Sequence, residues 1–259
     1  MQVGGQMQAG TELSMNPEFA RYGRQLGIDG FGVKGQERLR DARVAISRTG
    51  GVGGTVAMHL ARAGVGKLTL AHGGVVEPEG LNRWPLAFSK DLGRPSAECH
   101  AETIKLINPD VEVVAFNENV SDGNVGMIVA GADIIVDAAP LFEERYLLNQ
   151  AAVERGVRLV TGAMYDMECS VTVICPGESP CFACINPAKP DYWDNIYVFA
   201  AIGPGPAVVG AVMAMEVIKL IAGVGQPLTG KLWYFDMRSN TCRLITVKRR
   251  DDCEVCAWL

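Results

Sequence analysis

Apolar and polar positions alternate along the first part of the chain in a pattern that predicts strands and helices in turn. An apolar run at residues 43–47 leads directly into a glycine-rich turn, which is followed by a helical pattern at 55–63 and a strand at 67–71. This order is typical of the opening unit of a nucleotide-binding doubly wound domain. The alternation then continues, with helices and strands expected at residues 97–107, 111–116, 132–137, 141–155 and 158–162.

The pattern changes from about residue 166 onward. One long helix is expected at 207–221, and further strands are expected at 168–175, 231–236 and 243–247. Strands that follow one another without intervening helices favour antiparallel pairing. We therefore expect a Rossmann-like α/β fold with a doubly wound mixed sheet, formed by a single domain over residues 18–259. Residues 1–17 are rich in Gln and Gly and are expected to form a flexible tail.

The composition narrows the class of protein. Of 259 residues, 48% are apolar and 20% are charged, which is typical of a globular domain and not of a disordered chain. The net charge of −5 and the pI near 5.3 provide no drive toward nucleic acid or anionic membranes. The most apolar stretch is interrupted by Pro204, Pro206, Glu216 and Lys219, so no membrane span is expected. Because the chain begins without a signal-peptide pattern, the expected location is cytoplasmic.

Four of the eight cysteines form two C-x-x-C pairs, Cys181 with Cys184 and Cys253 with Cys256. Two such pairs can supply the four thiolates of a tetrahedral zinc site, because two intervening residues let both sulfurs of a turn reach one ion at about 2.3 Å. We therefore predict a structural zinc ion that ties the middle of the chain to its C-terminal end. Unrelated surface pairs and redox dithiols are the alternative interpretations.

Several short motifs occur in unbroken order along the chain. They are RYGRQ at 21–25, GQERL at 35–39, the glycine turn at 50–53, AGVGKL at 63–68, GLNR at 80–83, LINP at 106–109 and RYLLN at 145–149. Together they resemble the superfamily of ubiquitin-activating enzymes and their bacterial relatives, most closely the MoeB, ThiF and HesA adenylyltransferases. The cysteine pairs stand where this family places its structural zinc, and the resemblance extends from about residue 18 to the C-terminus.

The resemblance implies a specific chemistry. In this family ATP and magnesium lie over the glycine turn, here Gly50, Gly51 and Gly53, and the C-terminal carboxylate of a ubiquitin-like protein ending in Gly-Gly is adenylated. An arginine from the N-terminal segment of one subunit reaches the nucleotide of the other, and Arg24 occupies that position. Arg83 matches a second arginine that faces the phosphates. Arg24 and Arg83 are therefore the candidate catalytic residues.

The resemblance fails at positions that hold the nucleotide in the family. Arg48 stands at the first fingerprint glycine, where its side chain would crowd the adenosine or point into its pocket. His72 and Gly74 replace acids of the ribose-binding segment. Further replacements are Gly80 for Asn, Trp84 for Gln, Ser96 for Lys and Pro140 for the magnesium-binding Asp. Because the ribose anchor, the metal ligand and a phosphate-neutralising cation are lost, the chain alone is not expected to use ATP and magnesium by the usual mechanism.

The thioester-forming cysteine that some family members carry is missing as well. No cysteine lies between residues 185 and 206. That segment contains Trp193, Tyr197 and Phe199. These aromatic residues are interpreted either as part of the core or as the lining of a groove for a peptide tail or an apolar small molecule.

Three kinds of function remain open at this point. In the first, the chain is a helper half of a dimer that serves a ubiquitin-like or sulfur-carrier pathway and donates Arg24 to an intact family member. In the second, it is an enzyme on the same fold. That enzyme is either an adenylyltransferase with substitute contacts or a protein that binds a small anion without magnesium through Arg48, His72, Arg83 and Trp84. In the third, it is a non-catalytic homodimer that recognises a protein tail.

Overall fold

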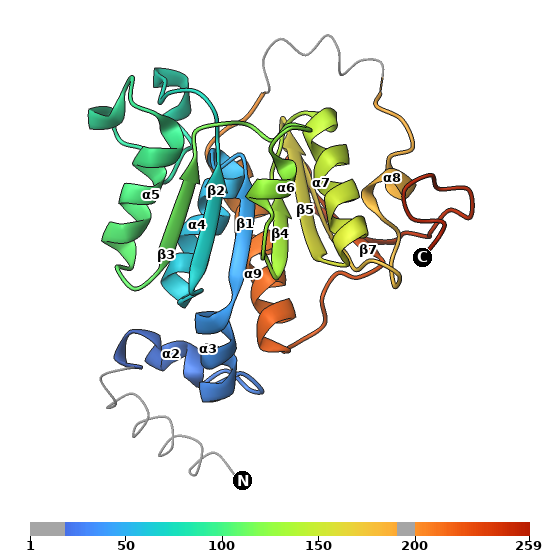
Figure 1. Ribbon diagram of the computed structural model, residues 1–259, viewed down its shortest axis with the longest axis horizontal. Coiled ribbons are helices and arrows are strands. Elements are labelled where there is room, and N and C mark those ends of the chain that lie inside the picture. Colours follow the sequence, from blue (N-terminus) through green and yellow to red (C-terminus); the bar gives the residue numbers. More distant parts are fainter. Residues whose placement is uncertain (1–18, 191–199) are drawn as a thin grey trace.

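The computed structural model describes residues 19–190 and 200–259, in which eight strands form one sheet in the order β3-β2-β1-β4-β5-β6-β7-β8 (Figure 1). The first five strands in this order run parallel, and β6, β7 and β8 pair antiparallel at the other side. The fold is therefore the expected α/β fold with a mixed sheet. The strands are β1 (Arg43–Ser47), β2 (Lys67–Ala71), β3 (Glu112–Phe116), β4 (Ile134–Asp137), β5 (Arg158–Tyr165), β6 (Glu168–Ile174), β7 (Lys231–Asp236) and β8 (Thr241–Thr246).

Helices cover both faces of the sheet and bury two separate apolar clusters (Figure 1). The cluster on one face includes residues of α3, α4 and α9, and the cluster on the other face includes residues of α6, α7 and α8. The helices are η1 (Ala20–Tyr22), α2 (Gly23–Leu26), α3 (Gly32–Asp41), α4 (Gly51–Ala63), η2 (Pro78–Gly80), η3 (Ser89–Asp91), α5 (Ser96–Ile107), α6 (Val125–Ile128), α7 (Phe142–Arg155), α8 (Phe182–Ile185) and α9 (Pro204–Ala222).

The expected elements are found, and the structure moves mainly their ends. Helix α4 begins at Gly51 and not at residue 55, because the glycines themselves form its first turn. A methyl group at Gly53 would lie 2.7 Å from the carbonyl oxygen of Arg48, so only glycine lets the helix start this close to the end of β1. Strand β5 continues to Tyr165, beyond the expected residue 162, because its pairing with β6 runs as far as the Tyr165–Glu168 pair.

Helix α9 is the one helix of the described residues that is long and apolar enough to cross a membrane. Its buried residues include Val209, Met213 and Val217, which belong to the core cluster beneath the sheet. A methyl group at Gly162 of β5 would lie 2.4 Å from the sulfur of Met213, so the helix packs directly against the strand. Core packing therefore accounts for its apolar composition.

Two sequence predictions concern residues that the structure does not describe. The expected tail at 1–17 and the aromatic residues Trp193, Tyr197 and Phe199 lie outside the described residues. The two interpretations of those aromatic residues remain open.

Candidate functional site

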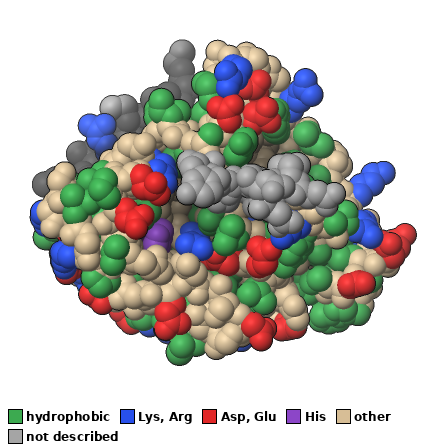
Figure 2. All heavy atoms as spheres, turned by 90° about the horizontal axis from the view of Figure 1, so that it is seen from above, with side chains coloured by type: hydrophobic (Ala, Val, Ile, Leu, Met, Phe, Trp, Pro, Cys, Tyr) green, Lys and Arg blue, Asp and Glu red, His purple; other side chains and the backbone are tan. Residues whose placement is uncertain are grey.

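A cavity of about 330 Å³ opens where β1, β2 and β4 end. Ligands of doubly wound sheets bind at the carboxyl ends of the strands, next to the point where the strand order reverses, which here lies between β1 and β4. Viewed toward this end of the sheet, the surface is recessed, and a histidine is visible in the recess beside a basic side chain (Figure 2). The cavity lining brings together Arg48, Gly50, Gly51, His72, Arg83 and Trp84, whereas Gly53 is buried inside α4.

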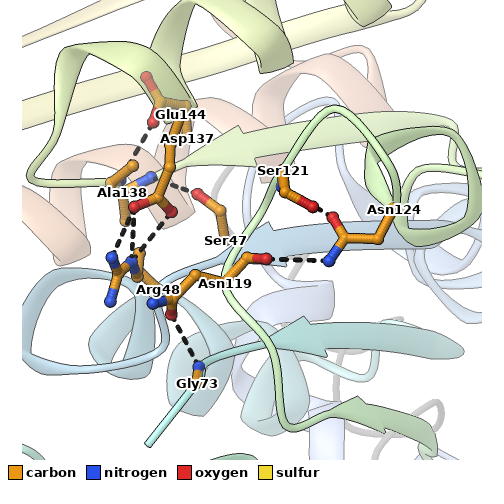
Figure 3. A network of polar contacts seen from close by, with 10 residues as sticks. Ser47, Arg48, Gly73, Asn119, Ser121, Asn124, Asp137, Ala138 and Glu144 are labelled. Atoms are coloured by element: carbon orange, nitrogen blue, oxygen red, sulfur yellow. Dashed lines mark hydrogen bonds and ion pairs between the residues drawn. The ribbon is translucent and has the colours of Figure 1, made fainter.

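Arg48 follows β1 and has a left-handed backbone conformation, with φ at 53°. Its guanidinium forms a two-pronged ion pair with Glu144 of α7 (Figure 3), in which Nε lies 2.9 and 3.0 Å from the carboxylate oxygens and Nη2 lies 2.5 Å from Oε1. The two side chains are 18% and 6% exposed. The protein itself therefore already neutralises the charge of Arg48, and the binding of a ligand by this residue remains a prediction.

Glu144→Gln should destabilise the protein by about 1–3 kcal/mol, because Arg48 would keep its charge in a mostly buried position without a carboxylate partner. Urea unfolding followed by circular dichroism measures the difference. The matched control is Glu143→Gln, since this neighbouring carboxylate is exposed and its ion pair with Lys189 lies at the surface. Equal losses of stability in the two variants would contradict the importance of the Arg48–Glu144 pair.

Trp84, His72 and His100 form an aromatic cluster at the base of the cavity. The ring centroid of His72 lies 4.9 Å from that of Trp84 and 5.6 Å from that of His100, and each pair meets edge to face. His100 Nδ1 lies 2.9 Å from Thr49 Oγ1. Burial lowers the pKa of His72 to about 3, helped by the positive charge of Arg48, and burial also lowers the pKa of His100 to about 4. Both histidines are therefore neutral at pH 7.

The indole of Trp84 lies directly against the glycine turn. A methyl group at Gly50 would lie 3.0 Å from the indole Nε1, and a methyl group at Gly80 would lie 2.8 Å from Cδ2 of the same ring. Trp84 therefore fits only because neither neighbour has a side chain. The sequence pointed to Trp84 and Gly80 as separate replacements, and the structure shows that they are packed together.

The two candidate catalytic arginines lie in different places. Arg83 lines the cavity, and its Nη1 donates to the carbonyl oxygen of Glu79 at 2.6 Å and to Oδ1 of Asn82 at 3.1 Å. It makes no ion pair with any residue that the structure describes. Arg24 is exposed on α2 and is not among the described residues that line the cavity of its own chain. A role for Arg24 in catalysis would therefore require a second chain.

Asp137 ends β4 and is fully buried, and both of its carboxylate oxygens have partners. Oδ1 accepts the backbone N–H of Ala139 at 3.0 Å, and Oδ2 accepts Nε of Arg145 at 3.0 Å and the hydroxyl of Thr161 at 2.7 Å. Pro140, which lines the cavity, has no side-chain ligand atom to offer. The end of β4 therefore presents no free carboxylate to a metal ion.

A second cavity, of about 240 Å³, adjoins the first over β5, β6 and β7. The two cavities share Arg145, Ala163 and Met164 as lining residues. The rest of the second lining comes from residues far apart in the chain, among them Phe142, Tyr165, Thr172 and Tyr234. This groove could not be predicted from the sequence, because only the sheet register brings these residues together.

The four cysteines of the two C-x-x-C pairs lie together, as expected, and all of them are buried. Their sulfur atoms fall within 4.8 Å of one another, with the Cys181–Cys253 and Cys184–Cys256 pairs at 3.6 and 3.4 Å. A tetrahedron of thiolates around zinc has edges of about 3.8 Å, so the spacing fits such an ion. The backbone N–H of Arg250 also donates to the sulfur of Cys184, as expected for a thiolate ligand.

Comparison with known proteins gives consistent results. A sequence model of the ThiF family matches residues 22–255. The heterocyst protein HesA of Trichormus variabilis is 38% identical over 245 residues, which cover 94% of this chain and 91% of HesA. The sulfur carrier protein adenylyltransferase of Thermus thermophilus is 36% identical over 246 residues, covering 92% of this chain and 91% of that protein. A crystal structure of Escherichia coli MccB with ATP has the same fold, with a TM-score of 0.84 at 24% identity over 95% of this chain and 76% of MccB.

Proposed function

This chain belongs to the ThiF family, and we propose that it serves a ubiquitin-like or sulfur-carrier activation pathway as the non-adenylating half of a dimer, to which it contributes Arg24. One combination of observations carries the proposal. The indole of Trp84 covers the glycine turn that would hold a nucleotide, while Arg24 is exposed on helix α2 without an ion-pair partner among the described residues.

Magnesium and ATP do not fit the cavity well. Trp84 and His72 occupy the space next to Gly50, where a nucleoside would approach the glycine turn. The carboxylate of Asp137 already accepts hydrogen bonds from Arg145 and Thr161. Among the described lining residues only Glu79 carries a carboxylate, and it is solvent-exposed. A single exposed carboxylate is a poor site for a magnesium ion that must also be held against phosphates.

The second cavity supports a function in which this chain binds a protein partner, and not one in which the chain is only a structural component. It adjoins the first cavity at Arg145, Ala163 and Met164, so an extended peptide lying over β5–β7 would end at the glycine turn. This path suits the C-terminal tail of a carrier protein, such as one that ends in Gly-Gly. A homodimer that only holds this tail is the second candidate function, and it is favoured by the same groove.

The cysteine cluster is proposed to hold a structural zinc ion. All four positions of a tetrahedral site would be filled by Cys181, Cys184, Cys253 and Cys256, so no position is left for a substrate. The ion would fix the segment around α8 to the C-terminal end of the chain, which lie side by side in the fold (Figure 1). It therefore supports the wall of the second cavity, to which Phe182 and Ile185 of α8 belong.

The helper function predicts that this chain has no adenylation activity alone and raises that of a partner. ATP–pyrophosphate exchange should be absent with the purified chain, and an intact ThiF-family member with its carrier protein should exchange faster when this chain is added than without it. In that mixture Arg24→Ala should lower the exchange rate by about 10²- to 10³-fold, because a charge that stabilises the transition state is lost.

The matched control for that experiment is Arg21→Ala. Arg21 is also exposed and lies on the same N-terminal segment, but its guanidinium donates to the carbonyl oxygen of Ile107 in its own chain. This variant should leave the exchange rate unchanged. Exchange by the chain alone would overturn the helper function, and so would equal activity of the mixture with and without Arg24→Ala.

A further inference from the structure

The first cavity contains one buried polar side chain that the described residues leave without a partner. His72 is only 7% exposed, and its imidazole makes no hydrogen bond to any described residue. Its Nδ1 is fully inaccessible and unpartnered. The imidazole lines the cavity, and a ligand there would bond to its other nitrogen, Nε2, because the inaccessible Nδ1 cannot be reached from the cavity. Since this imidazole is neutral at pH 7, it has one N–H to donate.

The charges of the lining favour an anion at one end of the cavity. Of its three arginines, Arg48 is neutralised by Glu144 and Arg145 by Asp137. Arg83 alone donates only to uncharged oxygens, so its positive charge remains available. It lies beside the start of α4, since a methyl group at Gly51 would be 3.5 Å from its Cγ.

Helix α4 adds to the same positive region. It is 13 residues long and begins at Gly51, so its first N–H groups have no partner within the helix and point toward the cavity end where Gly50 and Gly51 form the lining. His72 lies on the other side of this turn, since a methyl group at Gly50 would be 3.4 Å from its Cε1. An oxyanion at the turn would therefore meet the helix start, the guanidinium of Arg83 and the imidazole of His72.

The part of the cavity beside such an anion is unsuited to a nucleoside. The indole of Trp84 fills the position over Gly50, and Pro140, Met164 and Pro206 line the cavity further on. None of these three side chains can bind ribose hydroxyl groups. The cavity thus combines one anion position with a short apolar chamber.

We propose that this cavity binds a compact oxyanion, a small carboxylate or inorganic phosphate, without magnesium and without a nucleoside, and that Trp84 is the residue that excludes the nucleoside. The proposal deepens the proposed function and rests on it in one respect: a chain that does not adenylate leaves this position free.

Isothermal titration calorimetry of the full-length, metal-loaded protein with inorganic phosphate and, separately, with acetate tests the anion position. Each titration is performed after dialysis against magnesium-free buffer. Arg83→Met should weaken binding at least about tenfold, because a charge-assisted hydrogen bond is lost. Glu79→Gln should tighten binding, since it removes the one carboxylate of the described lining. Arg62→Met, which removes an exposed arginine at the far end of α4, should leave the affinity unchanged.

Titration with phosphate and with acetate distinguishes a phosphate-binding cavity from a carboxylate-binding one. Binding of phosphate but not acetate assigns the cavity to phosphate, and the reverse result assigns it to carboxylates. Failure of both ligands to bind, or equal affinities of the wild type and Arg83→Met, would overturn the anion site. Neither result would affect the proposed helper function, which the pyrophosphate exchange of the dimer decides independently.

Trp84→Gln tests the exclusion of the nucleoside, because it opens the space over Gly50. It should bind ATP at least about tenfold more tightly than the wild type while phosphate binding is retained. Trp84→Phe keeps a ring at this position and should continue to exclude ATP. Retained phosphate binding shows that the variant is folded. Equal affinities of the wild type and Trp84→Gln for ATP would contradict the role assigned to Trp84.

Discussion

Cys256→Ser is expected to release the zinc ion proposed for the cysteine cluster and to lower the midpoint of thermal unfolding by at least about 8 °C. Structural zinc sites contribute their binding free energy directly to folding, about 10–16 kcal/mol in small zinc domains, and a loss of even about 4 kcal/mol shifts the midpoint of a protein of this size by that amount. The four buried sulfurs also gain nothing from one another without an ion, because thiols are weak hydrogen-bond donors. Elemental mass spectrometry measures the zinc content, and a thermal unfolding curve gives the midpoint.

The matched control for this variant is Cys242→Ser. Cys242 is exposed on β8 and lies outside the cluster, so its replacement should change neither the zinc content nor the midpoint. A purified wild type without metal, or a Cys256→Ser variant that melts like the wild type, would contradict a structural zinc ion. Disulfides within the pairs, detected without reductant as a mass lower by two hydrogen atoms per pair, would favour the redox interpretation instead.

The elements of the fold could be predicted because each is encoded locally. Three neighbouring parts of the chain show this: the apolar run at Arg43–Ser47, the glycine turn and the apolar spacing of α4. The predicted ends of these elements differ from the observed ends only where a tertiary contact sets the boundary. The start of α4 is such a case, because it depends on how close Gly53 comes to the end of β1. The clustering of the cysteines was predictable as well, since a metal site imposes its own spacing.

The partners of the site residues could not be predicted in the same way. Arg48 and Glu144 are 96 positions apart, so the ion pair of the cation at the glycine turn could not be recognised from local sequence. The buried pair of Asp137 with Arg145 lies within one segment, but the hydroxyl that completes it comes from Thr161 of the next strand. Predicting such networks requires the register of the sheet, which a single sequence does not specify.

The replacements at the nucleotide position are coupled by packing and are not independent. Trp84 needs the missing side chains of Gly50 and Gly80, and its ring meets His72 and His100 edge to face. An aspartate at position 72 would place a buried charge against this ring system, which is strongly unfavourable without a partner. Restoring an aspartate at position 72 alone is therefore expected to destabilise the site, whereas Trp84→Gln introduces no charge and only removes the ring, and this is why Trp84 is the residue to change first.

Asp137→Asn is expected to destabilise the protein by about 3–5 kcal/mol. Arg145 is 8% exposed and Asp137 is fully buried, so removing the carboxylate charge leaves a buried guanidinium with no compensating anion. The ring of Phe182, 4.6 Å from the guanidinium carbon, cannot replace that charge. Chemical denaturation gives the loss of free energy of unfolding. Asp133→Asn is the matched control, because Asp133 is exposed at the opposite end of the same strand and only caps the backbone N–H of Arg43.

A double variant separates the loss of the pair from the loss of its packing. Replacing both charges, in Asp137→Asn with Arg145→Met, removes the uncompensated cation while methionine refills part of its volume, so the double variant should be more stable than Asp137→Asn alone. A loss below about 1 kcal/mol in the single variant, or a double variant no more stable than it, would contradict a buried ion pair at the end of β4. In that case the carboxylate of Asp137 would not be held in an ion pair and would be able to bind a metal ion. The free energy of unfolding of Asp137→Asn therefore also tests whether the cavity lacks a carboxylate that could bind magnesium.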